Sequence, residues 1–214
     1  MQLFEKYRPA CWQDVVGQTV VINRITTLEG RTGLGGRAFW LAGQSGTGKS
    51  TIARLIANTV AEAWTIEELD AQWLTPARIA EIVRQIDSRP LGGRGWALIV
   101  NEAHGLSSAA VRALLVALEP VPKHVVWIFT TTTEGQEALF EGCEDSSPLL
   151  SRCLQLPLAR RDLAQAFAEL AQAIALKEGL DGGKPIEWFK KLAQRCRNNM
   201  RAMLCELETG AALV

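Results

Sequence analysis

A glycine-rich stretch in the first quarter of the chain has the residue types needed to hold a phosphate group. The sequence GQSGTGKST, residues 43–51, directly follows the apolar run 38–42. Its spacing matches the pattern G-x-x-x-x-G-K-[ST], in which glycines allow backbone N–H groups to curl around phosphate oxygens. In this pattern a lysine reaches the β- and γ-phosphates and a hydroxyl ligates Mg²⁺. The stretch therefore predicts a nucleoside triphosphate site.

Two side chains of this loop have specific predicted roles. Lys49 is the predicted phosphate-binding amine, and the Ser50 hydroxyl is the predicted Mg²⁺ ligand. A helix beginning at Ser50 would direct the positive end of its dipole at the anion. The loop residues that we assign to nucleotide binding are Gly43, Gln44, Ser45, Gly46, Thr47, Gly48, Lys49, Ser50 and Thr51.

A second polar pair, Asn101 and Glu102, directly follows the apolar run 96–100. In ATPases with such a loop, an acidic residue at the end of a buried strand helps to hold Mg²⁺, and a following glutamate can polarise the attacking water. Glu102 suits the second role. Asn101 stands where an aspartate is usual, and its amide brings no negative charge to the metal. The pair predicts catalysis by Glu102, a weak or water-mediated metal contact at Asn101, and slow hydrolysis.

The elements that must position these residues alternate between strands and helices. The uninterrupted apolar runs 38–42, 96–100 and 125–129 are typical of buried parallel strands, and residues 64–69 also predict a strand. Helical patterns cover residues 19–30, 50–63, 75–86 and 107–119, the last capped by Ser107 or Ser108. This alternation predicts an α/β fold, a parallel sheet with helices on both faces.

The strand pattern stops after about residue 158. Amphipathic helices are predicted over residues 162–178, 186–197 and 199–209. We therefore expect two domains, an α/β nucleotide-binding domain over residues 1–158 and a small all-helical lid over residues 159–214.

Composition narrows the class of protein. The chain has 214 residues, of which 48% are hydrophobic and 21% charged, and its formal net charge is zero. This is the composition of a globular protein. A net charge of zero gives no overall electrostatic attraction to nucleic acid or to a membrane. Five scattered cysteines and two histidines predict no structural zinc site, and an odd cysteine count suits a reducing compartment. We expect a soluble cytoplasmic or nucleoid-associated protein that is not secreted and has no membrane partner.

Several motifs occur in the order found in one family. They are residues 4–9 and 14–18, the loop 43–51, the box 101–104, and residues 150–153. Together they resemble the sliding-clamp loader ATPases, that is, the replication factor C small subunits and the bacterial DNA polymerase III gamma/tau subunits of the AAA+ superfamily. The resemblance implies a P-loop parallel sheet with a helical lid. It also implies an ATPase that uses ATP and Mg²⁺ in an oligomer of AAA+ subunits and loads a sliding clamp on primer–template DNA during replication.

The resemblance also implies roles for residues outside the loop. Phe4, Arg8 and Val16 match positions around the adenine and ribose. Thr132 matches the sensor of the γ-phosphate, with the adjacent Thr131 as the alternative.

Two arginines match motif positions of the same family. Arg152 matches the arginine finger, which acts on ATP in the neighbouring subunit, and Arg201 matches the sensor arginine of the lid. A guanidinium suits both places because it stays charged and can grip two phosphate oxygens.

DNA contact rests almost entirely on the resemblance. The arginines that we assign to it are Arg78, Arg84, Arg89, Arg94 and Arg112.

Two departures from the family stand out: the zinc-binding cysteine cluster of the bacterial gamma subunits is missing, and no segment after the lid matches the collar that joins clamp-loader subunits. We therefore expect either a truncated form or another mode of assembly. Two alternative functions are an ATP-binding switch subunit with weak hydrolysis and an AAA+ remodeller of another DNA-bound complex.

Overall fold

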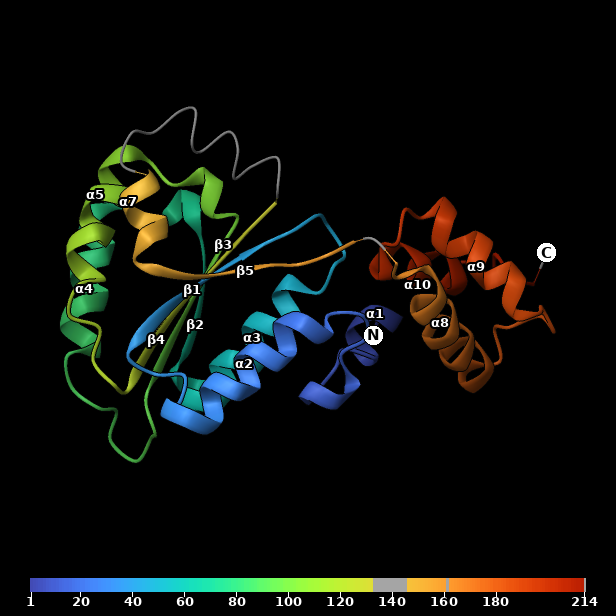
Figure 1. The fold of residues 1–214 in the computed structure, drawn as a ribbon, viewed down its shortest axis with the longest axis horizontal. Coiled ribbons are helices and arrows are strands. Elements are labelled where there is room, and N and C mark those ends of the chain that lie inside the picture. The colour runs from blue at the N-terminus through green and yellow to red at the C-terminus, as the bar shows by residue number, and fades with distance from the viewer. Residues whose placement is uncertain (133–145, 161, 214) are drawn as a thin grey trace. The chain divides into compact units, whose positions relative to one another are not determined.

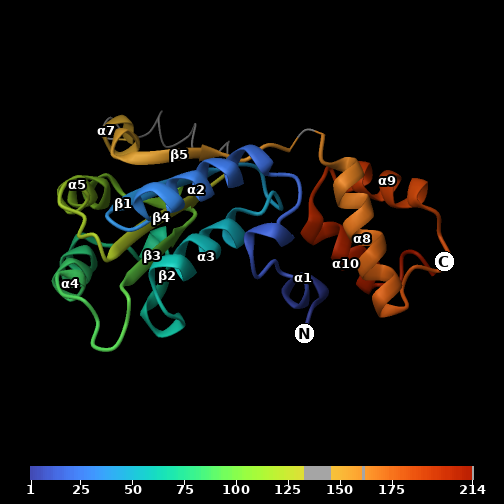
Figure 2. The ribbon, with the colours of Figure 1, turned by 60° about the horizontal axis from the view of Figure 1, so that its bottom comes forward.

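The fold is described from a computed structural model, which covers residues 1–132, 146–160 and 162–213. Cys143 lies outside these ranges. The chain forms two compact units (Figures 1 and 2). The sheet unit comprises Val21–Gly43 and Lys49–Pro157, and the helical unit comprises Met1–Val20, Gln44–Gly48 and Leu158–Val214.

The sheet unit is built on five parallel strands in the order β2-β3-β4-β1-β5. They are β1 (Arg37–Ala42), β2 (Ile66–Asp70), β3 (Trp96–Asn101), β4 (Val125–Thr131) and β5 (Cys153–Pro157). In the register, Ala42 lies opposite Thr131 and Asp70 lies opposite Asn101. The carboxyl ends of these strands therefore lie at one edge of the sheet. The predicted parallel sheet is confirmed.

Helices cover both faces of this sheet, as Figure 1 shows. On one side lie α2 (Thr19–Thr32) and α3 (Lys49–Val60), and on the other lie α4 (Pro76–Ile86), α5 (Ser108–Ala117) and α7 (Ser146–Ser151). Local caps fix where two of them begin. The Thr75 hydroxyl accepts from the backbone N–H of Arg78 at 3.2 Å, and the Ser107 hydroxyl accepts from that of Ala110, also at 3.2 Å. Ser107 is thus the cap of α5.

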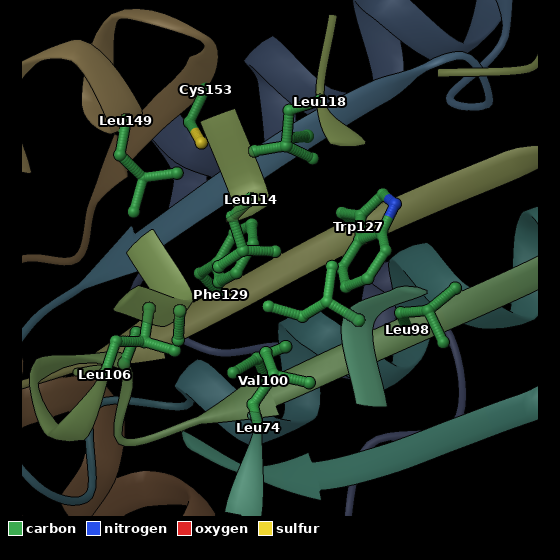
Figure 3. Packing of buried hydrophobic residues seen from close by; sticks show 14 of the residues in the cluster. Leu74, Leu98, Val100, Leu106, Leu114, Leu118, Trp127, Phe129, Leu149 and Cys153 are labelled. Carbon is green, nitrogen blue, oxygen red and sulfur yellow. The ribbon is translucent and has the colours of Figure 1, made fainter. Parts of the chain in front are cut away.

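The core on the α4 and α5 side is built around stacked aromatic rings. Trp127 and Phe129 of β4 have ring centroids 6.1 Å apart, and Trp40 of β1 stacks on Phe129 at 5.6 Å. Figure 3 shows Leu98 near the Trp127 ring. Cys153 belongs to the same cluster, and burial raises the pKa of its thiol to about 12. Cys153 is therefore a packing residue and not a nucleophile.

The helical unit joins both ends of the chain. It contains α1 (Leu3–Lys6), α8 (Ala164–Glu178), α9 (Ile186–Arg195) and α10 (Met200–Glu208). Leu3, only 5% exposed, packs in one cluster with Phe167, Phe189 and Leu204. Lys6 pairs with Glu178 at 2.7 Å. The first twenty residues, expected in the first domain, therefore pack with the helices that follow Leu158.

The structure differs from the predicted elements at three places. The second strand begins at Ile66, because Trp64 belongs to a short 3₁₀ helix and is 61% exposed. The helix after the glycine-rich loop ends at Val60 rather than near residue 63. Residues 153–157 form the unpredicted edge strand β5, whose sequence CLQLP alternates weakly and ends in proline. The 3₁₀ helices are η1 (Trp12–Asp14), η2 (Ala63–Thr65), η3 (Ala71–Trp73) and η4 (Ala103–Gly105).

Within the described ranges, no helix combines the length and the apolar character needed to span a bilayer.

The buried aromatic core gives a stability prediction. Trp127 is fully buried, whereas Trp73 is 77% exposed. Trp127→Ala leaves a cavity beneath α4 and α5, so we expect a loss of about 3–5 kcal/mol in the free energy of unfolding. The same change at Trp73 should alter it by no more than about 0.5 kcal/mol. Urea unfolding of both variants measures this, and equal losses would contradict the packing described.

Candidate nucleotide-binding site

The glycine-rich loop connects the end of β1 to the start of α3. Lys49, the first residue of α3, is 9% exposed, and its ammonium donates to the Gly43 carbonyl at 2.8 Å. The Gly43 N–H donates to the carbonyl of Thr131 at the end of β4, at 3.2 Å. Ser50 and Thr51 are half-buried in the first turn of α3. The buried amine of Lys49, at the end of the loop, thus bonds to Gly43, at its start, and lies beside the N-terminus of α3.

Within the loop, Gly46 is a position where only glycine fits. Its φ is +78°, and a Cβ there would lie 2.0 Å from Oδ1 of Asn199. Asn199 is fixed because its side chain accepts from the N–H of Ala202 at 3.1 Å and caps α10. The predicted glycine at this position therefore serves close packing as well as a left-handed backbone.

Gln18 holds the same loop from the other end of the sequence. Its side chain is buried, and its Nε2 donates to the Ala159 carbonyl at 2.7 Å and to the Thr47 carbonyl at 3.3 Å. Its Oε1 accepts from the Ala159 N–H at 3.1 Å. One amide thus joins the loop to the segment that leads into α8. Sequence reasoning gave Gln18 no role, because its partners are backbone groups 29 and 141 residues away.

Arg160 makes a further link within the helical unit, between the loop and the turn before α10. Its guanidinium bonds to Oε1 of Gln44 and to the carbonyl of Arg197. Nδ2 of Asn198 donates to the Arg160 carbonyl at 3.0 Å. Arg197 and Asn198 both have left-handed backbones, with φ of 51°. The turn before α10 is therefore shaped to meet Arg160, which the sequence did not single out.

The predicted adenine-side residues and the lid arginine all lie in the helical unit. The Arg201 guanidinium lies 5.2 Å from the centroid of the Phe4 ring. Val16 packs against the core of this unit, and Arg8 pairs with Glu5. The structure thus brings Phe4 and Arg201 together although 197 positions separate them in the sequence (201 − 4). Their roles toward a nucleotide stay predictions.

At the end of β3, the Asn101 amide is fixed on both sides. Its Nδ2 donates to Oε1 of Glu68 at 3.0 Å, and its Oδ1 accepts from the Thr130 hydroxyl at 3.0 Å. Glu68, on β2, also accepts from Arg54 at 3.0 Å. A carboxylate therefore lies directly beside position 101, although it comes from the neighbouring strand. The sequence did not point to Glu68, because only strand pairing brings it there.

Glu102 adopts a strained conformation immediately after β3. Its φ and ψ are 51° and 49°, a left-handed backbone that is uncommon for any residue other than glycine. Its Oε2 lies 3.5 Å from Nδ1 of His104, which lies 3.3 Å from the Thr131 hydroxyl. The Glu102 side chain is half-exposed. This geometry leaves the carboxylate accessible at the edge where the strands end, as a general base requires.

The two threonines considered for the γ-phosphate sensor differ in their surroundings. Thr131, the last residue of β4, is fully buried, and its hydroxyl donates to the Thr132 carbonyl at 3.2 Å. Thr132 directly follows the strand and is half-buried. The choice of Thr132 stays a prediction, with Thr131 as the alternative.

Arg152 lies at the opposite end of the sheet from the loop. Ala38 pairs with Cys153, so Arg152 precedes β5 at the amino end of the strands, whereas Gly43 follows β1 at the carboxyl end. Arg152 is level with Arg37, and six residue steps from there to Gly43 span about 20 Å. The Arg152 guanidinium donates to Glu119 at 2.8 Å and to the Pro148 carbonyl at 3.2 Å. Arg152 is therefore not brought together with Lys49 in the same chain.

The arginines predicted for DNA contact do not form one free basic patch. Arg78 bonds to Glu67 and Glu81, and the Glu67 hydrogen bond raises the pKa of its guanidinium. Arg94 pairs with Glu62 at 2.8 Å. Arg84, Arg89 and Arg112 are exposed. Arg78 and Arg94 are thus largely neutralised by carboxylates of their own chain, which sequence spacing alone did not reveal.

Comparison with known proteins shows which family the chain resembles. The model of the ATPase family associated with various cellular activities (AAA) matches residues 39–142, a range that holds the loop, Asn101 and Glu102. The chain is thus similar to the AAA family over these residues, and it resembles the clamp loaders. It is 26% identical to the DNA polymerase III subunit gamma of Buchnera aphidicola over 96% of this chain and 60% of that one. It is 27% identical to the subunit tau/gamma of Haemophilus influenzae over 99% of this chain and 32% of that one.

A solved structure shows the same AAA+ fold. The RuvB Holliday junction branch migration motor of Thermotoga maritima aligns with a TM-score of 0.73 over 94% of this chain and 64% of that one, at 22% identity. The curated relatives are longer: this chain spans less than two thirds of either subunit named above. The predicted fold class and the resemblance to clamp loaders are confirmed.

The Gln18 amide gives a prediction that depends on pH. Gln18→Glu replaces the donating Nε2 with an oxygen that faces the carbonyls of Thr47 and Ala159. Burial and these carbonyls raise the folded-state pKa of the new carboxyl above its unfolded value of about 4.3. The protonated acid can still donate, so the variant should approach the parent in stability near pH 4 and fall behind by about 1–3 kcal/mol at pH 7.

The matched control is Gln13→Glu, at an exposed position. Urea unfolding at several pH values measures both variants. A deficit for Gln18→Glu that does not change with pH, or one equal to that of Gln13→Glu, would contradict the role of Gln18.

Proposed function

We propose that this AAA+ chain binds and hydrolyses ATP with Mg²⁺. The observation that carries the proposal is the buried Lys49 ammonium, held at 2.8 Å from the Gly43 carbonyl at the start of α3. A buried amine next to a neutral carbonyl gains strongly from an anion, because a low-dielectric surrounding strengthens charge pairing. The loop glycines and the α3 N-terminus add backbone donors for the same anion.

The residues at the strand ends suit the chemistry of hydrolysis. Glu102 would orient and deprotonate the attacking water, and Thr132 or Thr131 would contact the γ-phosphate. Lys49 and the loop N–H groups would stabilise the charge that develops on the phosphoryl oxygens. Phe4, Arg8, Val16 and Arg201 are proposed as further nucleotide contacts. These assignments rest on the resemblance and on the side chains described above.

The oxygen donors of Ser50, in α3, and Asn101, at the end of β3, fit Mg²⁺, which prefers oxygen ligands. Ser50 supplies a hydroxyl, and Asn101 supplies an amide oxygen that already accepts from Thr130. Mg²⁺, when bound, neutralises charge on the phosphate oxygens. We propose that Glu68, which accepts from Nδ2 of Asn101, supplies the negative charge that an aspartate at position 101 would bring.

This arrangement predicts an unusual response to restoring the aspartate. In Asn101→Asp, two carboxylates would face each other where the 3.0 Å hydrogen bond to Glu68 now lies. The double variant Asn101→Asp/Glu68→Gln exchanges the amide and the acid. Because of the repulsion, the single variant should need about ten times more Mg²⁺ than the double variant for half-maximal ATP turnover. Turnover measured against Mg²⁺ concentration tests this, with Glu68→Gln alone as control. Improvement in the single Asn101→Asp variant as large as in the double variant would refute the role of Glu68.

We propose that hydrolysis takes place in an oligomer, with Arg152 acting on ATP bound by a neighbour. The support is geometric: Arg152 precedes β5, about 20 Å from the level of its own loop, so a contact with phosphate requires a second molecule. Head-to-tail assembly of identical chains places one end of a subunit against the opposite end of the next. An arginine supplied in this way stabilises the transferring phosphoryl group.

Complementation tests this assembly. Arg152→Ala should lower turnover by about 10³-fold, and Lys49→Ala should abolish it. An equal mixture of the two should recover about a quarter of the parent activity, because random head-to-tail contacts pair an intact loop with an intact finger once in four. The control is Arg195→Ala, which also removes an exposed ion pair, with Glu206 at 2.7 Å, and should leave turnover unchanged. A mixture that stays inactive would refute action between subunits.

We further propose clamp loading on primer–template DNA, because the relatives are named as DNA polymerase III subunits. Arg84, Arg89 and Arg112 are the exposed candidates for phosphate contact, and Arg78 and Arg94 would first have to leave their carboxylates. A second candidate function is an ATP-binding switch with weak hydrolysis, which the amide at Asn101 favours. Capture of a sliding clamp and stimulation of turnover by primed DNA support the first; ATP binding without either supports the second.

A further inference from the structure

A groove of about 680 Å³ lies in the sheet unit, away from the loop and the strand ends described above. One wall is the helix α2, and the floor includes Phe39 of β1 and Leu154 of β5. Its volume is that of an ordinary ligand site.

The groove exists because β5 is the last strand of the sheet. Phe39 pairs with Leu154, so both side chains project to the same face, the one on which α2 packs. Phe39 is buried, but Leu154 remains 39% exposed. Figure 2 shows α2 running alongside β5. Phe39 is thus covered, whereas Leu154 of β5 stays partly open beside the helix.

The described residues that line the groove include three arginines and no acidic side chain. Arg24 and Arg31 are exposed and seven positions apart on α2, so they project from one side of the helix about 10 Å from each other. Among the residues that the structure describes, neither has a hydrogen bond or an ion pair. Arg37 donates to the Thr32 hydroxyl at 3.1 Å, which keeps its guanidinium at the end of the groove.

We propose that this groove binds an acidic amphipathic segment of a partner protein. An apolar floor bordered by separated positive charges complements a peptide whose leucine-type side chains enter the groove and whose carboxylates meet the arginines. The backbone positions of Arg24 and Arg31 lie about 10 Å apart along α2, so their charges are spread along the groove rather than gathered at one point. A peptide with carboxylates about two helical turns apart reaches both.

Fluorescence anisotropy with a labelled synthetic peptide tests the proposal. The probe is a 14-residue helix-forming peptide with leucines on one face and glutamates beside them, and the comparison probe has glutamine in place of each glutamate. We expect the glutamate peptide to bind in a salt-dependent way, and Arg24→Glu/Arg31→Glu to weaken it at least about tenfold. Leu154→Asp should also weaken it, whereas Lys191→Glu, an equal charge change on α9, should not.

A probe of opposite charge separates a loss of the ion pairs from a general change in the structure of the double variant. A peptide with lysine in place of each glutamate should bind Arg24→Glu/Arg31→Glu better than it binds the parent chain. The proposal is overturned if the glutamate peptide fails to bind, if the glutamine peptide binds equally well, or if the double variant keeps full affinity. It is also overturned if sedimentation shows that the parent chain self-associates and that the double variant does not, because the occupant would then be a second copy.

Discussion

Parallel strand pairing is the constraint on which the rest of this molecule depends. The central strands β1, β3 and β4 are buried on both faces, so nearly all of their side chains are apolar and polar groups gather where these strands end. Because all strands run the same way, their ends meet at one edge. Gly43, Asn101 and Thr131 come from three different strands and are neighbours only for this reason. The same rule sends Arg152, which precedes its strand, to the other edge.

At this edge of the sheet, a carboxylate from one strand lies beside an amide from the next. The residue at the end of β3 is an amide, and the carboxylate beside it comes from β2. Thr130 and Glu68 bond to opposite sides of Asn101, so both the oxygen and the nitrogen of its amide have partners. Asn101 is half-buried and uses both ends of its amide in these bonds, which ties the identity of residue 101 to that of residue 68.

Much of this was predictable from local pattern. The strands 96–100 and 125–129 were clear because a short, uninterrupted apolar run between turn residues is typical of a buried strand, and the loop was clear because its glycines, lysine and serine have a fixed spacing. The edge strand β5 was missed because an edge strand is only partly covered. CLQLP has two buried side chains, Cys153 and Leu156, which project to opposite faces, so the sequence shows neither an uninterrupted apolar run nor a regular alternation. Gln18 and Glu68 were missed for a different reason. Each bonds to residues that are distant in the sequence and become neighbours only in the folded chain, so no local pattern indicates the pairing.

The composition of the helical unit has a consequence for the order in which the protein can fold. Its three segments come from the beginning of the chain, from the glycine-rich loop and from the residues after Leu158. During synthesis, the segment from Val21 to Pro157 emerges whole before most of α8, α9 and α10 exist. The sheet can therefore form early from nearby pairings, whereas Thr47 and Gln18 must wait for Ala159, 141 positions after Gln18. The loop would be the last part of the nucleotide site to gain its final shape, so a nascent chain would fold before it could respond to ATP.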